Sequence, residues 1–415
     1  MAVIRPFRAV RPRADIADKI AALPYDVMSS MEAREMVKGN PLSFLYIDRS
    51  ELNFPPEQDI YAPEVYNMAR EVYDRMKAKG EFIQDETPCL YLYRQIMDGR
   101  VQMGLALCAS VEDYLTDAIK KHELTREEKE RDRIRHVDAL NANTGPIFLT
   151  YRAKDEVTAI MQTWANAHTP VYDYVAEDGI SHTVWVIDDK SVIDTLVTAF
   201  AQIPALYIAD GHHRTASAVK VALMRRGDNA NYDKQAESEF FLAVVFPDKE
   251  LYIMDYNRVV KDLNGLTKEA FLAKIAESFD VEECKSGQVK PDAPRTFGMY
   301  LNDTWYKLTA KPKCVEGADV VGQLDVSILQ DYLLSPILGI GDVRVDKRID
   351  FVGGLRGLGE LERRVNSGEM AVAFAMFATT IDELMDIADA GKLMPPKSTW
   401  FEPKLRSGLL IHELA

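Results

Sequence analysis

The residues with the greatest chemical potential form one short run, Asp210-Gly211-His212-His213-Arg214-Thr215. An apolar strand is predicted just before it, over residues 205–208, and a helix is expected to start directly after the glycine. The first backbone N–H groups of a helix have no internal partner and favour an anion, and glycine lets a ligand approach the backbone closely. Arginine adds a two-pronged donor that suits phosphate. The run therefore predicts a phosphate-binding turn.

Each polar member of this turn has an expected role. Phosphate or nucleotide binding is expected of Gly211, Arg214 and Thr215. His212 and His213 can donate hydrogen bonds or relay a proton near neutral pH, and Asp210 can orient a histidine, hold Mg²⁺ or accept a proton. Zinc is disfavoured, because adjacent histidines without further spaced ligands make a poor tetrahedral set. The structural alternative is an ordinary capped helix start with two incidental histidines.

A second group of polar residues surrounds a charged run that is predicted to be helical, over residues 125–141. His122 and Glu123, just before it, could supply a general base or contact a substrate ammonium. On composition alone, a solvated helix with internal ion pairs explains the run equally well. A role in substrate binding or in a lid is expected for Thr125, Asp132 and Arg133, together with Asp26 from an N-terminal turn; this expectation follows from a family resemblance and not from spacing.

A third group lies near the C-terminus, in the proline-stiffened stretch Met394–Lys404. Its hydroxyl and ammonium groups could clamp phosphate oxygens, with the prolines holding them in place. The alternative is a surface tail that packs its aromatic side chains on the body of the protein. The phosphate-binding residues predicted here are Lys397, Ser398, Thr399 and Lys404.

Composition limits the functions open to the 415-residue chain. Its 50 basic and 65 acidic residues give a net charge of −15, which disfavours nucleic-acid partners but leaves room for a local phosphate pocket. The four cysteines are too few and too scattered for a disulfide framework or a zinc site. No apolar run is long enough to cross a membrane, and no signal peptide is recognisable, so a cytoplasmic location is expected.

The elements that must position these residues indicate an α+β fold with mixed or antiparallel sheets. A helix is predicted from Pro63, and a strand over residues 43–47. One hairpin is predicted to turn at Asp98-Gly99, and a second, over residues 240–256, at Pro247-Asp248. The looser pattern after residue 260 suggests two domains, 1–260 and 261–415, the second contributing the C-terminal motif.

The turn Asp210–Arg214 resembles the phosphate-binding element of the ParB/sulfiredoxin superfamily, and its Asp-Gly-His-x-Arg pattern is similar to that of the free serine kinases. The chain as a whole resembles the bacterial domain-of-unknown-function family 1015. The stretches that carry this resemblance are 24–27, 40–41, 121–125, 132–133, 210–214, 394–399 and 401–409. The resemblance implies a ParB-like phosphate-binding core in the first domain and an α/β region after it.

The same resemblance implies a phosphotransferase that acts on a small hydroxy amino acid, most simply a free serine kinase. The donor would be ADP, ATP or pyrophosphate, with Mg²⁺, and the partner a small phosphorylated metabolite. No P-loop pattern occurs, so the turn remains the predicted phosphate site. Two alternatives stay open: a phosphoserine phosphatase at the same site, and a CTP-binding ParB-like switch. A sulfiredoxin-like activity is disfavoured, because the turn has histidines where a cysteine is needed. The oligomeric state stays open.

Overall fold

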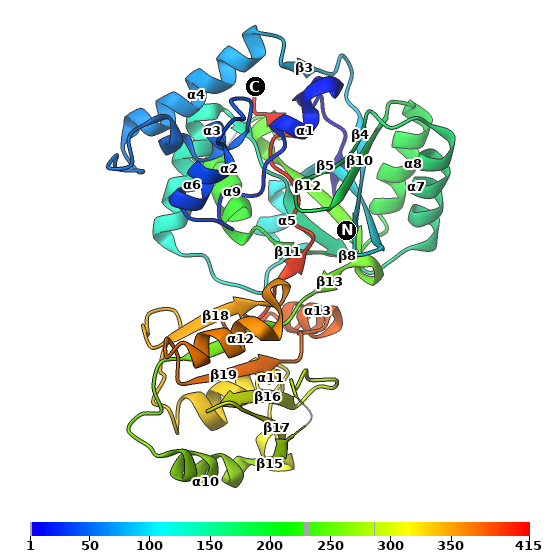
Figure 1. Ribbon diagram of the computed structural model, residues 1–415. Coiled ribbons are helices and arrows are strands. Elements are labelled where there is room, and N and C mark those ends of the chain that lie inside the picture. Colours follow the sequence, from blue (N-terminus) through cyan, green and yellow to red (C-terminus); the bar gives the residue numbers. More distant parts are fainter. Residues whose placement is uncertain (1, 228–231, 286) are drawn as a thin grey trace. The chain divides into compact units, whose positions relative to one another are not determined.

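The computed structural model describes residues 2–227, 232–285 and 287–415, and it divides the chain into two compact units (Figure 1). The first unit comprises Met1–Leu251 and Pro403–Ala415, and the second comprises Tyr252–Glu402. The predicted boundary after residue 260 therefore differs from the observed one by nine residues. The larger difference is that the last residues return to the first unit, where β21 (His412–Glu413) pairs with β7 (Ala142–Asn143).

A mixed sheet, nine-stranded among the described residues, is the centre of the first unit. Its order is β6-β11-β8-β12-β5-β4-β10-β9, with β1 beside β5. The β6–β11 and β8–β12 pairs are parallel and the remaining pairs are antiparallel. The strands are β1 (Ile4–Arg5), β4 (Leu90–Met97), β5 (Arg100–Ser110), β6 (Ile119–Lys120), β8 (Ile147–Tyr151), β9 (Tyr172–Val175), β10 (Ser181–Ile187), β11 (Leu206–Asp210) and β12 (Phe240–Pro247). A small separate pair joins β2 (Val10–Pro12) to β3 (Phe82–Gln84).

Helices cover this sheet in two groups (Figure 1). Helices α7 and α8 pack together and contribute Val157, Met161 and Leu196 to the main core. Helix α6 packs between α4 and α9, so its inner face is shielded from water. The helices are α1 (Ala17–Ile20), α2 (Ser30–Met36), α3 (Leu45–Asp48), α4 (Pro63–Ala78), α5 (Val111–Leu115), α6 (Glu127–Leu140), α7 (Asp155–Ala167), α8 (Lys190–Phe200) and α9 (His212–Arg226).

Several predicted elements are confirmed. Helix α4 begins at Pro63, whose missing N–H costs nothing in the first turn. The β4–β5 hairpin turns at Asp98 and Gly99, which have φ angles of 52° and 76°. A left-handed pair of this kind suits the twist of the flanking strands. The predicted α+β class with mixed sheets is also confirmed.

Two predicted elements are wrong. Residues 43–47 form no strand: Leu45–Asp48 is a helical turn whose Phe44, Leu45 and Ile47 side chains are buried in a second core. A short apolar run does not distinguish the two states, and burial on every side selected the helix. The hairpin over 240–256 is also absent, because β12 lies inside the sheet between β5 and β8, while β13 (Tyr252–Ile253) pairs with β20 (Phe401–Glu402).

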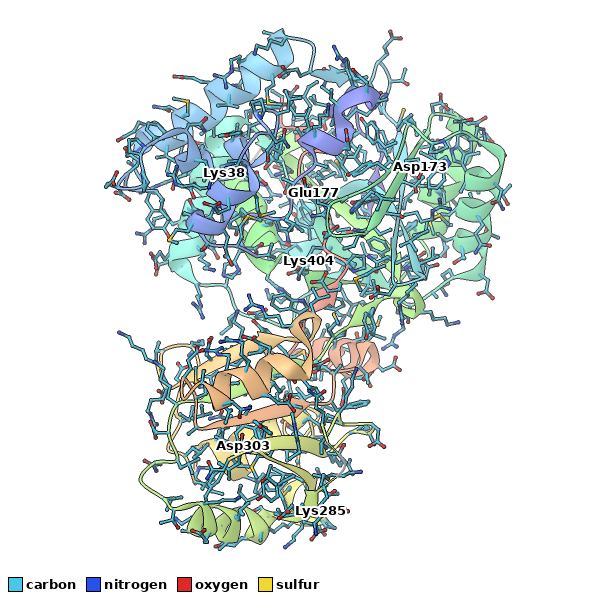
Figure 2. The ribbon with its side chains drawn as sticks, viewed as in Figure 1. Lys38, Asp173, Glu177, Lys285, Asp303 and Lys404 are labelled. Atoms are coloured by element: carbon cyan, nitrogen blue, oxygen red, sulfur yellow. The ribbon has the colours of Figure 1, made fainter. Side chains whose placement is uncertain are left out.

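The second unit is built on a six-stranded sheet in which every pair is antiparallel, in the order β15-β17-β16-β19-β14-β18. Its strands are β14 (Tyr256–Val260), β15 (Phe279–Cys284), β16 (Thr296–Leu301), β17 (Thr304–Ala310), β18 (Ile349–Gly353) and β19 (Val372–Met376). Its helices are α10 (Lys268–Ser278), α11 (Asp325–Leu329), α12 (Gly357–Asn366) and α13 (Ile381–Asp389), with a π-helical turn η6 (Gln330–Leu334). Figure 2 labels Asp303 at the β16–β17 turn of this unit.

Among the described residues, no helix combines the length and apolar character needed to cross a membrane.

The C-terminal segment is held in the first unit by buried polar contacts. Arg406 forms an ion pair with Asp178 and donates through Nε to the Nε2 atom of His182, at 3.2 Å. That nitrogen must therefore be unprotonated, so Nδ1 of His182 carries the proton and lies 2.7 Å from the Tyr93 hydroxyl. Two residues further on, Gly408 lies against the ring of Phe44.

Gly408→Ala should destabilise the first unit. Gly408 has φ +82°, and a methyl group there would meet the Phe44 ring at 2.5 Å. Gly80→Ala is the matched control, since Gly80 has φ +68° and open space around it. We expect both variants to lose the backbone advantage of glycine, and Gly408→Ala to lose about 1–3 kcal/mol more through overpacking. Urea unfolding measures this difference, and equal losses would contradict the tight contact.

His182 should make stability depend on pH. Burial, with a smaller contribution from Arg406, lowers the pKa of His182 to about 3, against about 6.5 for an unfolded histidine. Between these two pKa values, His182 binds a proton in the unfolded chain but not in the folded protein. The contribution of His182 to the unfolding free energy is therefore complete above pH 6.5 and is lost as the pH falls toward 3. Between pH 6.5 and 5, His182→Gln should have an unfolding free energy that falls less steeply than that of the wild type, by up to ~1.4 kcal/mol per pH unit. Parallel slopes would contradict it.

Candidate active site

The predicted turn forms at the end of β11. Asp210 is the last residue of the strand, and α9 begins at His212 with Gly211 as its N-cap. Gly211 has φ +94°, a left-handed conformation that glycine adopts without strain. A side chain there would also lie 3.2 Å from Nε of Arg214. The first free N–H groups of α9 and the Arg214 guanidinium are therefore held in one place by the turn. Thr215 is fully buried and donates its hydroxyl hydrogen to the Gly211 carbonyl, at 3.0 Å.

Arg214 is half-buried, and its hydrogen-bond donors are only partly satisfied. One guanidinium nitrogen, NH1, donates to the Pro146 carbonyl at 2.5 Å, while Nε has no hydrogen-bond partner among the described residues. Burial opposes its charge, but nearby Asp26 and Asp210 raise its pKa above the ordinary value. A buried N–H donor without an acceptor is costly, so the site is ready to accept an anion.

Asp210 is held in its ionised form. Nζ of Lys404 lies 3.0 Å from one carboxylate oxygen, and the backbone N–H of Gly211 donates to the other at 2.8 Å. Burial opposes ionisation, but Lys404 and Arg214 hold the pKa of Asp210 well below its usual range. A carboxylate this acidic is a poor proton acceptor. Of the predicted roles, orienting a neighbour or holding a cation fit it better. Figure 2 labels Lys404 on the segment that returns to the first unit.

Two adjoining cavities open in the first unit near this turn, with volumes of about 150 and 30 Å³. Four residues line both: Tyr25, Asp48, Arg133 and His136. The smaller cavity is also lined by Arg214, and the larger by Asp26 and Asp132. Four of the predicted residues thus line these two adjoining cavities: Asp26, Asp132, Arg133 and Arg214.

Arg133 is the cation at the junction of these cavities. It is 8% exposed, its guanidinium lies 4.0 Å from the centre of the Tyr25 ring, and it pairs with Asp132 at 2.7 Å. The Tyr66 hydroxyl donates to the other oxygen of Asp132, at 2.8 Å. Stacking and pairing together hold the planar guanidinium in a fixed orientation, which favours recognition of a carboxylate or phosphate.

Asp48 and His136 are site residues that the sequence analysis did not assign. Asp48 accepts a hydrogen bond from the Thr144 hydroxyl at 2.7 Å, and its carboxylate lies 3.8 Å from Nε2 of His136. That nitrogen is 3.1 Å from the Ile47 carbonyl, so it carries the proton. Burial and Arg133 lower the pKa of His136. The available signal was spacing: His136 follows Arg133 by three residues, which on a helix places both on one face.

His122, Glu123 and His212 form a separate cluster whose potential ligand atoms lie within 4.8 Å of one another. The rings of His122 and His212 meet edge to face, with centroids 4.4 Å apart. Neither ring nitrogen of His122 reaches hydrogen-bond geometry with a described residue, although the Ile208 carbonyl is near. Burial lowers the pKa of His122 to about 4, so the ring is neutral and one of its two nitrogens has a lone pair for a cation. Two histidines and a carboxylate suit manganese, iron or zinc better than magnesium.

His213 has a different position from His212. Its Nε2 accepts a hydrogen bond from the backbone N–H of Arg126 at 2.9 Å, and Thr125 donates to Glu130 at 2.6 Å. The first contact joins the start of α6 to α9, and the second lies within the N-terminal end of α6. The predicted lid segment is thus, in the structure, part of a packed helix whose inner side carries Arg133 to the cavity.

Three residues of the C-terminal motif lie in the second unit. Lys397 is exposed and has φ +63°, Ser398 is buried and donates to the Pro395 carbonyl at 2.5 Å, and Thr399 is half-buried. Only Lys404 of this predicted set belongs to the unit that contains the turn.

Gly211→Ala should move Arg214. The added methyl group would lie 3.2–3.3 Å from three guanidinium atoms, closer than most real contacts, in a backbone conformation that alanine rarely adopts. Gly179→Ala is the control, because Gly179 has φ +80° and no atom within 4 Å. We expect each variant to lose about 1 kcal/mol of unfolding free energy from its backbone. A thermal shift by pyrophosphate, which Arg214 would bind, should be reduced only in Gly211→Ala. An equal thermal shift in both variants would contradict the link.

Comparison with known proteins gives a family and a set of distant structures. The family described as "Protein of unknown function (DUF1015)" matches residues 4–327. No curated protein matches. Among solved structures, a free serine kinase in complex with AMP is 15% identical with a TM-score of 0.37, and covers 74% of this chain and 91% of its own. A conserved hypothetical protein from Pyrococcus furiosus is 15% identical over 74% and 94%, with a TM-score of 0.35.

SbnI with a C-terminal truncation, from Staphylococcus aureus, is 12% identical over 74% of this chain and 86% of that one, with a TM-score of 0.37. Likenesses at this level do not carry a reaction to this chain. The family match covers more than three quarters of the sequence and confirms the expected membership. This chain belongs to the DUF1015 family.

Proposed function

We propose that this protein is a phosphotransferase that moves a phosphoryl group from ADP, ATP or pyrophosphate to a small hydroxy amino acid, with serine as the first candidate. One observation carries the proposal: the buried Arg133 and the half-buried Arg214 line adjoining cavities that also share the carboxylate of Asp48. Phosphoryl transfer depends mainly on positioning and on neutralising charge on the transferred group, and fixed arginines supply both.

Donor phosphates would bind at the turn. The free N–H groups at the start of α9 point outward from the helix, and the unpartnered Nε of Arg214 adds a charged donor beside them. Gly211 lets the phosphate approach the backbone without a side chain in the way. The Asp-Gly-His-x-Arg resemblance to the free serine kinases points to the same use of this turn.

The amino acid would bind in the larger cavity, where both charges of a zwitterion have partners. Arg133 can contact a carboxylate, and Asp48 or Glu51 can contact an ammonium group or accept the hydroxyl proton. Glu51 is buried and pairs with Arg49 at 2.9 Å, so its position is also fixed. At about 150 Å³, the cavity is several times the volume of one water, about 30 Å³, and suits a small metabolite.

The expected Mg²⁺ can be compared with the side chains present. Mg²⁺ in kinases is held by one or two carboxylates together with substrate phosphates, and the ionised Asp210 at the turn fits that role. When bound, the ion would neutralise charge on the phosphates. The imidazole-rich cluster of His122, Glu123 and His212 fits a softer cation, so assays should include Mn²⁺ and Zn²⁺ as well.

The proposal is tested by incubating the purified protein with serine, each donor and Mg²⁺ or Mn²⁺, and measuring phosphoserine. Hydrolysis of phosphoserine is measured in parallel. If the same site transferred the phosphoryl group from phosphoserine to water, the protein would be a phosphatase. Turnover in the first assay supports the kinase. Hydrolysis alone would assign the phosphatase, and tight CTP binding without turnover would assign the switch.

Arg214→Ala should reduce kcat/KM for phosphoserine formation by about 10²–10³, the usual effect of removing one donor to developing charge. Arg214→Lys keeps the charge but loses the planar fork, so it should recover only part of the rate. Arg225→Gln is the control on the same helix, because Arg225 is exposed. Thermal unfolding verifies that each variant is folded. A wild-type rate in Arg214→Ala would remove the turn from the mechanism.

A further inference from the structure

A cavity of about 290 Å³ lies within the second unit, and the proposed phosphotransfer does not use it. One wall is the sheet, through Arg258 and Phe351. The others are the π-helical turn η6, the loop Gly341–Arg344, and Pro395-Pro396. Every lining residue belongs to the second unit, so the cavity is complete without the first.

Arg258 is a charged residue set into an otherwise apolar sheet face. It lies in the middle of β14, an interior strand, directly between Phe351 of β18 and Phe374 of β19, and Phe374 in turn pairs with Met299 of β16. Phe374 and Met299 are fully buried, and Arg258 itself is 4% exposed. The neighbouring residue Val259 faces the opposite side of the sheet, in the core below α12.

The charge of Arg258 is not neutralised by the protein. Its guanidinium donates to the carbonyls of Tyr256 and Lys397, the latter at 2.9 Å, and no carboxylate of the described residues pairs with it. Burial lowers the pKa of Arg258 to about 10. The carboxylate on the cavity wall, Asp342, pairs instead with Arg344 at 2.7 Å. Desolvating a cation without a counter-charge is unfavourable, so Arg258 destabilises the fold when no anion is bound.

The cavity walls hold this arrangement in place. Nε2 of Gln330 donates to the carbonyls of Ile340 and Gly341, at 2.9 and 3.1 Å, and so ties η6 to the loop that carries Arg344. π-Helical turns are rare and occur often at functional sites. On the other side, Pro395-Pro396 precedes Lys397, whose carbonyl anchors Arg258. The segment in which the sequence analysis predicted phosphate-binding residues is thus the one that positions the buried guanidinium.

We propose that this cavity binds a small anion that carries a phosphate or carboxylate group, with Arg258 as the recognising cation and Arg344 at the second wall. The Phe351 ring, whose centre is 5.4 Å from the Arg258 guanidinium, forms an aromatic wall for the body of the ligand. The site is independent of the phosphotransferase reaction proposed for the first unit.

Calorimetric titration of the full chain with pyrophosphate and, separately, with succinate tests the proposal. The variants are Arg258→Met, which removes the charge but keeps the volume, and the control Arg356→Gln, since Arg356 is an exposed arginine of the same unit. We expect the wild type and Arg356→Gln to show a binding event that Arg258→Met lacks. If Arg258→Met loses the binding of pyrophosphate, the ligand carries a phosphate group. If it loses the binding of succinate, the ligand carries a carboxylate.

Thermal unfolding without added anion separates this role from a structural one. A residue kept only for its two carbonyl contacts would leave Arg258→Met less stable, whereas a binding residue leaves the variant as stable as the wild type or more so. If Arg258→Met does not fold, Arg258→Lys replaces it, with binding at least 10-fold weaker expected because the fork is lost. The proposal would be overturned if the variant bound both anions with the affinity and stoichiometry of the wild type. It would also be overturned if neither the wild type nor the variant bound either anion. Because no turnover is measured, these outcomes are independent of the first unit's reaction.

Discussion

The first unit depends on the contact between Lys404 and Asp210. It joins residues 194 positions apart and places the ammonium group of the returning segment at the end of β11, where the strand gives way to α9. Without that cation, the half-buried carboxylate of Asp210 would lack its ion-pair partner beside the start of α9. Lys404 thus neutralises Asp210, whereas Nε of Arg214 keeps an N–H without an acceptor. The cation that stabilises the fold is therefore a different residue from the cation that is proposed to bind a ligand.

The segment 403–415 extends this constraint over the whole unit. After Lys404, Arg406 bonds to His182 and Asp178 on the sheet side, Gly408 packs against Phe44 in the second core, and β21 pairs with β7. The same thirteen residues thus connect the main sheet, the N-terminal helices and the turn between β11 and α9. A segment of this length has too little apolar surface to form a domain by itself, which explains why it is absorbed by the larger core.

Each unit contains an arginine whose polar surroundings are incomplete, though in different ways. Arg214 has carboxylates nearby and lacks an acceptor for one N–H, whereas Arg258 has carbonyl acceptors and lacks a counter-charge. Both conditions raise the free energy of the ligand-free fold, and an anion relieves both. Both proposals rest on this property, which is local and is therefore compatible with the net charge of −15 of the whole chain.

The sequence by itself determined the local features whose causes are local. The glycine after β11 had to begin a helix, Pro63 had to open another, and Asp98-Gly99 had to turn a hairpin, because backbone freedom and capping act within a few residues. Tertiary structure alone decided which distant groups meet. It turned residues 43–47 into a buried helix, moved β13 away from β12, and brought Asp48 and His136 to Arg133. It also divided the C-terminal motif between the two units, leaving Lys404 with Asp210 and Lys397 with Arg258. Burial and pairing of this kind depend on contacts between residues up to 194 positions apart, which no local pattern records.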